Sequence, residues 1–191
     1  PLTGDFNGDG RTDVALVNQA AGWTMMPVAF ANGDGTWRIT NSSSGNFAGL
    51  AAQPTVLPLT GDFDGDKRTD VALVNHAAGW TTMPVAFANG DGTWRITNGD
   101  IGKKFAGWAA TYGVQPLTGD FNGDGRTDVA LVNKAAGWRM MPVALAIGDG
   151  GWQVIPVVDE NLFSWWATTP SATPLTGDFN GDGRTDVALV N

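Results

Sequence analysis

Short apolar runs, each bounded by glycine and aspartate, set the pattern of this chain. The run "DVALVN" at 13–18 is a continuous apolar segment after a glycine-rich turn, which predicts a strand buried on both faces. The stretch "MPVAFANGDGTWRIT" at 26–40 predicts two strands around a Gly-Asp-Gly turn, with Pro27 near the start of the first, where a missing N–H is tolerated. The segment "QPLTGDF" at 115–121 predicts a further short strand. No segment has sustained helical periodicity, so we expect an all-β protein.

The whole pattern repeats along the chain. Pro-Leu-Thr-Gly-Asp begins at Pro1, Pro58, Pro116 and Pro174, at spacings of 57, 58 and 58 residues. Four short strands in about 58 residues, repeated, predict β-propeller blades of four antiparallel strands. The predicted units are three full repeats and a partial fourth in one continuous propeller segment: 1–57, 58–115, 116–173 and 174–191.

The number of repeats bears on association. A blade needs neighbours to cover its faces, and propellers usually close with roughly four to eight blades. Three full units and part of a fourth would leave two open faces and unpaired strand edges. We therefore expect either self-association that closes the propeller or a place within a longer chain.

Composition narrows the function classes. The formal net charge of −8 argues against nucleic acid as a partner, since phosphate recognition requires clustered Lys and Arg. The absence of cysteine excludes disulfides and thiolate metal sites. No long apolar run is present, so we expect no membrane insertion.

The acidic charge is concentrated in one repeated loop. In "DFNGDGRTD" at 5–13, oxygen-bearing side chains occupy positions 1, 3, 5 and 9, and position 7 can offer its backbone carbonyl. Numerous hard oxygen ligands on a flexible loop favour calcium over zinc or copper. Position 12 is Leu16 and not Glu, so the loop is not an EF-hand. The alternative is a turn that only caps strands with Asx-type hydrogen bonds. The loop occurs four times, and each copy has three or four carboxylates within nine residues that would repel without a cation, so we favour up to four Ca²⁺ ions.

The predicted calcium ligands follow the same positions in every loop. They are Asp5, Asn7, Asp9, the Arg11 carbonyl and Asp13; Asp62, Asp64, Asp66, the Arg68 carbonyl and Asp70; Asp120, Asn122, Asp124, the Arg126 carbonyl and Asp128; and Asp178, Asn180, Asp182, the Arg184 carbonyl and Asp186. The second loop has an extra carboxylate at Asp64 and Lys67 in place of a glycine, so we expect a different affinity there.

These motifs carry a family resemblance. The stretch "GDFNGDGRTDVALV" resembles the FG-GAP/VCBS type of repeat, which implies a calcium-binding β-propeller like those of integrin α chains. The order of acidic loop, apolar strand, "NGDGTW" and Phe-x-x-Trp is similar to fungal propeller lectins of the Psathyrella velutina lectin type, which implies glycan binding, with N-acetylglucosamine as the expected kind of sugar. The segment "LVNHAAGW" departs from the Gly-Phe-Gly segment of those lectins, so no sugar ligand is carried over residue by residue.

The tryptophans are the candidate sugar platforms, because sugars stack their C–H faces on indole rings. Two of them, Trp108 and Trp166, lie in the segments that link one unit to the next, where Leu50 occupies the first position. Three more follow the "AAG" turns: Trp23, Trp80 and Trp138. For all five, packing remains the alternative. A last set sits inside a strand pattern and is predicted to be core: Trp37, Trp94 and Trp152.

Catalytic groups are scarce. His76 is the only histidine, and its repeat equivalents are Gln19 and Lys134, which favours an exposed side chain over a general base. With no cysteine, a nucleophile–histidine pair has little to draw on, so we expect no enzyme. Three hypotheses remain: a calcium-stabilised lectin, an integrin-like protein–protein adhesion module, and a non-catalytic appendage of a larger secreted enzyme. Because calcium is plentiful outside the cell, the predicted calcium sites indicate an extracellular, secreted protein.

Overall fold

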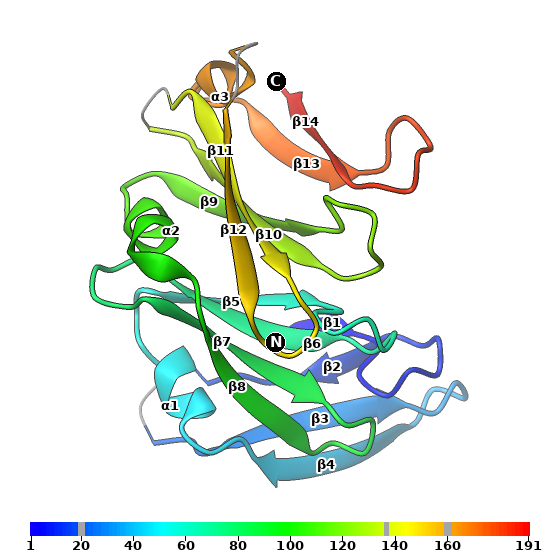
Figure 1. Cartoon of the computed structure of the whole chain (residues 1–191). Coiled ribbons are helices and arrows are strands. Elements are labelled where there is room, and N and C mark those ends of the chain that lie inside the picture. Colours follow the sequence, from blue (N-terminus) through cyan, green and yellow to red (C-terminus); the bar gives the residue numbers. More distant parts are fainter. Residues whose placement is uncertain (19–21, 136–137, 159–161) are drawn as a thin grey trace.

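The computed structural model describes residues 1–18, 22–135, 138–158 and 162–191, and forms a stack of antiparallel sheets (Figure 1). The first sheet contains β1 (Leu2–Gly4), β2 (Asp13–Ala15), β3 (Met25–Ala31) and β4 (Trp37–Ser43). The second contains β5 (Val56–Gly61), β6 (Asp70–Asn75), β7 (Thr82–Ala88) and β8 (Trp94–Asp100). The third contains β9 (Val114–Gly119), β10 (Asp128–Asn133), β11 (Met140–Ala146) and β12 (Trp152–Val158). A two-stranded sheet of β13 (Thr173–Gly177) and β14 (Asp186–Val190) follows.

Each full sheet is one propeller blade, in which neighbours in sequence are neighbours in the sheet. The first strands of successive blades, β1, β5, β9 and β13, contact one another in turn, as do the innermost strands of a propeller. The prediction of an all-β propeller with four-stranded blades is therefore confirmed, and the last sheet contains only the first two strands of a blade.

The core lies between blades. Between the first and second blades, Phe6, Met26 and Phe30 pack against Val71 and Leu73, and all five side chains are almost fully buried. Every residue of β6 and of β10 is buried, as "DVALVN" predicts for a strand covered on both faces. The same sequence in β14 is only half-buried, because no further blade covers it.

Three short helices link the blades: α1 (Phe47–Ala51), α2 (Gly102–Ala109) and α3 (Phe163–Trp166). The all-β fold holds, and these three short helices were not predicted from the sequence. Segments of four to eight residues are too short to reveal a helical period in a sequence. The Phe-x-x-Trp-like elements lie in these helices, and their first residues Phe47 and Phe105 are almost fully buried. Of the helices described, none has the length and apolar character needed to cross a membrane.

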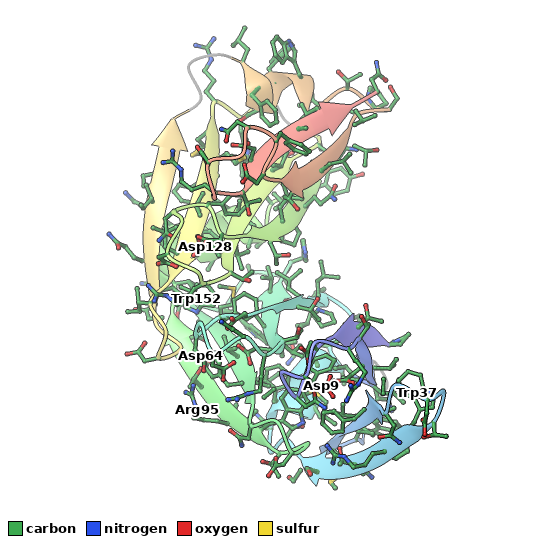
Figure 2. The ribbon with its side chains drawn as sticks, turned by 90° about the vertical axis from the view of Figure 1, so that its right-hand side faces the viewer. Asp9, Trp37, Asp64, Arg95, Asp128 and Trp152 are labelled. Atoms are coloured by element: carbon green, nitrogen blue, oxygen red, sulfur yellow. The ribbon has the colours of Figure 1, made fainter. Side chains whose placement is uncertain are left out.

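The tryptophans at the start of the fourth strands depend on the neighbouring blade. Trp94 and Trp152 are buried and meet the preceding blade edge to face, with ring centroids 5.8 Å from Phe6 and 5.7 Å from Phe63, respectively. Trp37 is 50% exposed, so the prediction that it is core is wrong. No other blade covers Trp37 in this structure, and Figure 2 shows it at the free side of the stack.

Candidate functional site

Each acidic loop joins the first two strands of its sheet, and the loops lie at one end of the sheets, away from the helices (Figure 1). The first aspartate of each loop closes the turn around its own carboxylate. Asp5 accepts backbone N–H groups from Gly8 at 2.7 Å, Asp9 at 3.1 Å and Gly10 at 2.7 Å. Asp62, Asp120 and Asp178 accept the equivalent three bonds. These bonds are the Asx-type turn that was the alternative hypothesis, so the loop frame forms through its own hydrogen bonds.

The last aspartate of each complete blade ties the loop to the third strand. Asp70 is fully buried, and its carboxylate accepts the Phe63 N–H and the Ala88 N–H, both at 2.9 Å. Asp13 and Asp128 make the same pair of bonds. Asp186 accepts only the Phe179 N–H, at 3.0 Å, among the contacts described, since its blade lacks a third strand here. The aspartate predicted as a calcium ligand is therefore also a clamp that ties the second strand to the loop and to the third strand.

The arginines add a second tie. The Arg68 Nε donates to the Ala88 carbonyl at 2.7 Å, and the Arg68 guanidinium pairs with Asp66. Arg11 and Arg126 repeat this arrangement. Arg184 keeps the ion pair with Asp182 at 2.9 Å. The fifth-position aspartates, Asp9, Asp66, Asp124 and Asp182, are thus paired with cations of their own loops, while the ligand role of the four arginine carbonyls stays a prediction.

The third position separates the loops. Asn7 and Asn122 donate their amide N–H to the neighbouring aspartate at 3.0 and 2.8 Å, and Asn180 does so at 3.3 Å. Asp64 in the second loop has no N–H to donate. One of its oxygens accepts the Arg95 guanidinium at 2.9 Å (Figure 2), and the other is buried with no hydrogen-bond partner among the residues described.

The second loop brings three carboxylates together. Asp62, Asp64 and Asp70 each place an oxygen within 4.8 Å of the others, the one such group in the described part of the chain. Burial, followed by the charges of Asp66 and Asp62, raises the pKa of Asp64. Burial raises the pKa of Asp70 to about 8 although two backbone N–H groups donate to it. Asp128, in the third loop, reaches only about 6 for the same cause. Three clustered carboxylates, one of which has a buried oxygen without a hydrogen-bond partner among the residues described, fit a hard divalent cation such as Ca²⁺.

At the opposite end of the blades, two equivalent hollows contain an indole ring and an amide. A hollow of about 220 Å³ in the first blade is lined by Gly22, Trp23, Thr24, Met25, Pro27 and Asn41. A hollow of about 230 Å³ at the second blade is lined by Gly79, Trp80, Thr81, Thr82, Pro84 and Asn98, with Leu50 contributed by α1 of the preceding unit. Trp80 also lines a hollow of about 330 Å³ together with Lys103, Ala106 and Gly107 of α2.

The remaining candidate platforms lie elsewhere. Trp108 and Trp138 pack against the core between the second and third blades. Trp166 is 59% exposed on α3. None of these three rings lines the hollows at Trp23 and Trp80. Sequence reasoning missed Asn41 and Asn98, which face the indoles from a strand that pairs with the one after the "AAGW" turn. Their identical place in two repeats was the signal that could have found them.

Comparison with known families decides the relationship. A family model described as FG-GAP-like repeat matches residues 5–73, 62–131 and 120–189. The chain belongs to the FG-GAP-like repeat family. Each match runs from one acidic loop into the apolar strand of the next unit, so the FG-GAP-like match covers the repeat unit found in the sequence.

A solved structure of a lectin from Agrocybe aegerita is similar to this FG-GAP-like chain. The two share 25% sequence identity and a TM-score of 0.72, over 98% of this chain and 45% of the lectin chain. That structure is described as giving the structural basis for specific recognition of non-reducing terminal N-acetylglucosamine by the lectin. The FG-GAP-like chain thus spans less than half the length of this lectin. No curated protein matches the sequence.

Proposed function

We propose that this chain is a calcium-stabilised, carbohydrate-binding β-propeller that acts outside the cell as a lectin-like module without catalysis. The recurring hollow that pairs Trp23 with Asn41 and Trp80 with Asn98 carries this proposal. The likeness to a lectin that recognises terminal N-acetylglucosamine supports a glycan of that kind as the ligand.

The chemistry of the hollows suits a sugar. An indole face provides apolar surface for the C–H groups of a pyranose ring. The Asn98 amide can both donate and accept hydrogen bonds, and the Thr81 and Thr82 hydroxyls can do the same, which matches the mixed hydrogen bonding of sugar hydroxyls and an acetamido group. Of the five predicted platforms, we therefore favour Trp23 and Trp80 over Trp108, Trp138 and Trp166.

The third blade differs at this site. The position of Asn41 and Asn98 is held by Pro156, and that of Thr24 and Thr81 by Arg139. Proline has no amide side chain to orient a sugar, so the third blade lacks the amide that lies beside Trp23 and Trp80. We therefore expect two sugar sites in this chain and not one for every indole that follows an "AAG" turn.

Calcium would stabilise the opposite end. Asp62, Asp64 and Asp70 are the residues that would hold the ion, and its positive charge would favour their ionised forms. The three loops with asparagine at the third position offer fewer charges, so we expect weaker binding there. The proposal includes self-association of the chain through its open ends.

A glycan array in calcium and after chelation, followed by titration of hits, tests the proposal. Binding of N-acetylglucosamine-terminated glycans should be lost in the double variant Trp23→Ala/Trp80→Ala. Trp166→Ala is the control and should keep binding, because it also removes an exposed indole but not one that lines the two hollows. Loss in Trp166→Ala alone would return the site to the linking segments. No glycan signal from folded, calcium-loaded protein would overturn the lectin proposal and favour a protein partner.

A further inference from the structure

The same backbone hydrogen bond recurs between successive blades. A threonine N–H near the end of each acidic loop donates to the carbonyl of the first aspartate in the preceding loop. The three pairs are Thr69 to Asp5 at 2.6 Å, Thr127 to Asp62 at 2.6 Å and Thr185 to Asp120 at 2.7 Å. The last pair shows that a two-stranded half-blade is enough to make this bond.

The same junctions repeat two close packings. A Cβ at Gly4, Gly61 or Gly119 would lie 2.3 or 2.4 Å from the threonine of the following blade, so only glycine fits there. Four residues later, within the acidic loop, a glycine lies against an arginine stem of the following blade: Gly8 against Arg68, Gly65 against Arg126 and Gly123 against Arg184. An aromatic pair completes the two full junctions, Phe6 with Trp94 and Phe63 with Trp152.

Each junction joins two faces, one on the preceding blade and one on the following blade. The C-terminal end of the stack exposes a face of the first kind, and the N-terminal end exposes a face of the second kind. At the C-terminal end, Phe179 is 60% exposed, and a Cβ placed at Gly181 would meet no atom within 4 Å among the residues described. At the N-terminal end, Thr12 is exposed and Trp37 stands free, unlike its buried equivalents. The two ends lie at opposite extremes of the stack, so they cannot meet within one chain of this shape (Figure 1).

The C-terminal half also has the right sequence. Residues 174–191 are identical to residues 1–18, so β13, β14 and their loop offer the same groups that the first blade offers to the second. The N-terminal half in turn has Arg11, Thr12 and Trp37 where the second blade has Arg68, Thr69 and Trp94.

We propose that the N-terminal face of one copy docks head to tail on the C-terminal face of a second copy. The Thr12 N–H donates to the Asp178 carbonyl, Arg11 lies against Gly181, and Trp37 covers Phe179. Each contact copies one already present twice or more inside the chain. Because the two faces differ, the interface is heterologous and generates a ring or an open chain of copies, not a twofold dimer.

Sedimentation equilibrium or light scattering of the 191-residue chain over a range of concentrations tests this docking. The wild-type protein should exceed its 20.0 kDa monomer mass. Trp37→Ser spoils one face and Gly177→Val the other, and each should lower the association constant at least tenfold. An equimolar mixture of the two variants retains one intact face of each kind, so it should form a heterodimer and stop there.

The outcomes separate docking from its rivals. Tyr112→Ser, an exposed ring between the second and third blades, is the matched control and should associate like wild type. A monomeric wild-type protein, or unchanged association in both face variants, overturns the proposal. Thr12→Arg distinguishes docking from an exchange in which 174–191 displaces the identical 1–18 of a second copy. Docking requires Thr12 and should be lost in this variant, whereas continued association would overturn docking in favour of exchange.

Discussion

The second and third acidic loops share one frame and differ in charge. Asp62 and Asp120 accept the same three backbone N–H bonds, with lengths that agree within 0.1 Å. Asp70 and Asp128 clamp the same strands at 2.9 Å. The difference is that Asp64 replaces Asn122, which converts an internally bonded amide into a charged group with a buried, unpaired oxygen. The frame of such a loop is thus independent of its charge, and among the described residues the second loop alone gathers three carboxylates that could hold a metal ion.

The clamp should show the largest effect. Asp128→Asn leaves one acceptor oxygen and turns an amide N–H donor toward one of the two backbone N–H groups. It should therefore lower the free energy of unfolding by about 3 kcal/mol. Urea denaturation at pH 7.5 measures this change. Asp70→Asn should cost as much in calcium, where the carboxylate is ionised, and less after chelation. Asp186→Asn is the control, since Asp186 is partly exposed and should change stability by less than about 0.5 kcal/mol. Equal costs at Asp128 and Asp186 would contradict the clamp.

The pH dependence of stability should differ with and without calcium. Burial raises the pKa of Asp70 to about 8 and of Asp128 to about 6, above the value of about 4 expected in the unfolded chain. The folded protein therefore holds protons that the unfolded chain releases, and this stabilisation is complete below about pH 4 and lost as pH rises through 6 and then 8.

After chelation, the free energy of unfolding should fall by about 2 kcal/mol between pH 6 and 8.5, mostly through Asp70. Calcium favours the ionised carboxylates and should flatten this decrease. Urea denaturation across the pH range measures both curves, and Asp70→Asn should remove most of the slope. A stability that rises with pH in the chelated protein would contradict the assignment.

Exchanging the third-position residues should exchange the calcium behaviour. Asp64→Asn removes one of three clustered carboxylates and should weaken calcium binding at the second loop about tenfold, or about 1.4 kcal/mol, by calorimetry. In chelator the same variant should melt at a higher temperature, because the repulsion of Asp64 by the charges of Asp66 and Asp62 is gone. Asn122→Asp is the reciprocal variant and should strengthen binding at the third loop. If neither variant alters calcium binding, the third position does not set affinity.

The smallest effect concerns the backbone. Lys67 adopts φ 68°, where Gly125 has φ 82° in the third loop, and a side chain in this left-handed region is strained. Lys67→Gly should raise the free energy of unfolding by about 1 kcal/mol, and Gly125→Lys should lower it by a similar amount. Thermal denaturation with chelator present measures both. A loss of stability in Lys67→Gly would show that the lysine side chain contributes more than its strain costs.

The sequence predicted the features that local pattern controls. A run such as "DVALVN" carries its burial in its own composition, and the spacing of the repeats fixed four strands to a blade. The Asx-type turn around Asp5 was also open to prediction, because all its bonds fall within five residues. The clamp by Asp70 was not predicted, because its second partner is the N–H of Ala88, 18 residues away on another strand.

The indoles show the same limit. Trp94 and Trp37 occupy the same position of identical "GDGTWRIT" segments, and one is buried while the other is half-exposed. Only the presence of a preceding blade separates them, and no local pattern contains that information. The pairing of Asn98 with Trp80 likewise arises from strand register and not from spacing along the chain.

The bond from Thr69 to Asp5 is repeated at each junction, so this fold can accept different numbers of repeat units. Each unit recognises its neighbour by atoms that every unit carries, so a unit gained or lost by duplication meets a surface that already fits. Folding free energy should then grow by a nearly constant increment per junction, as in a one-dimensional lattice with nearest-neighbour coupling. A sequence of this kind can change its length within a lineage before any of its side chains change.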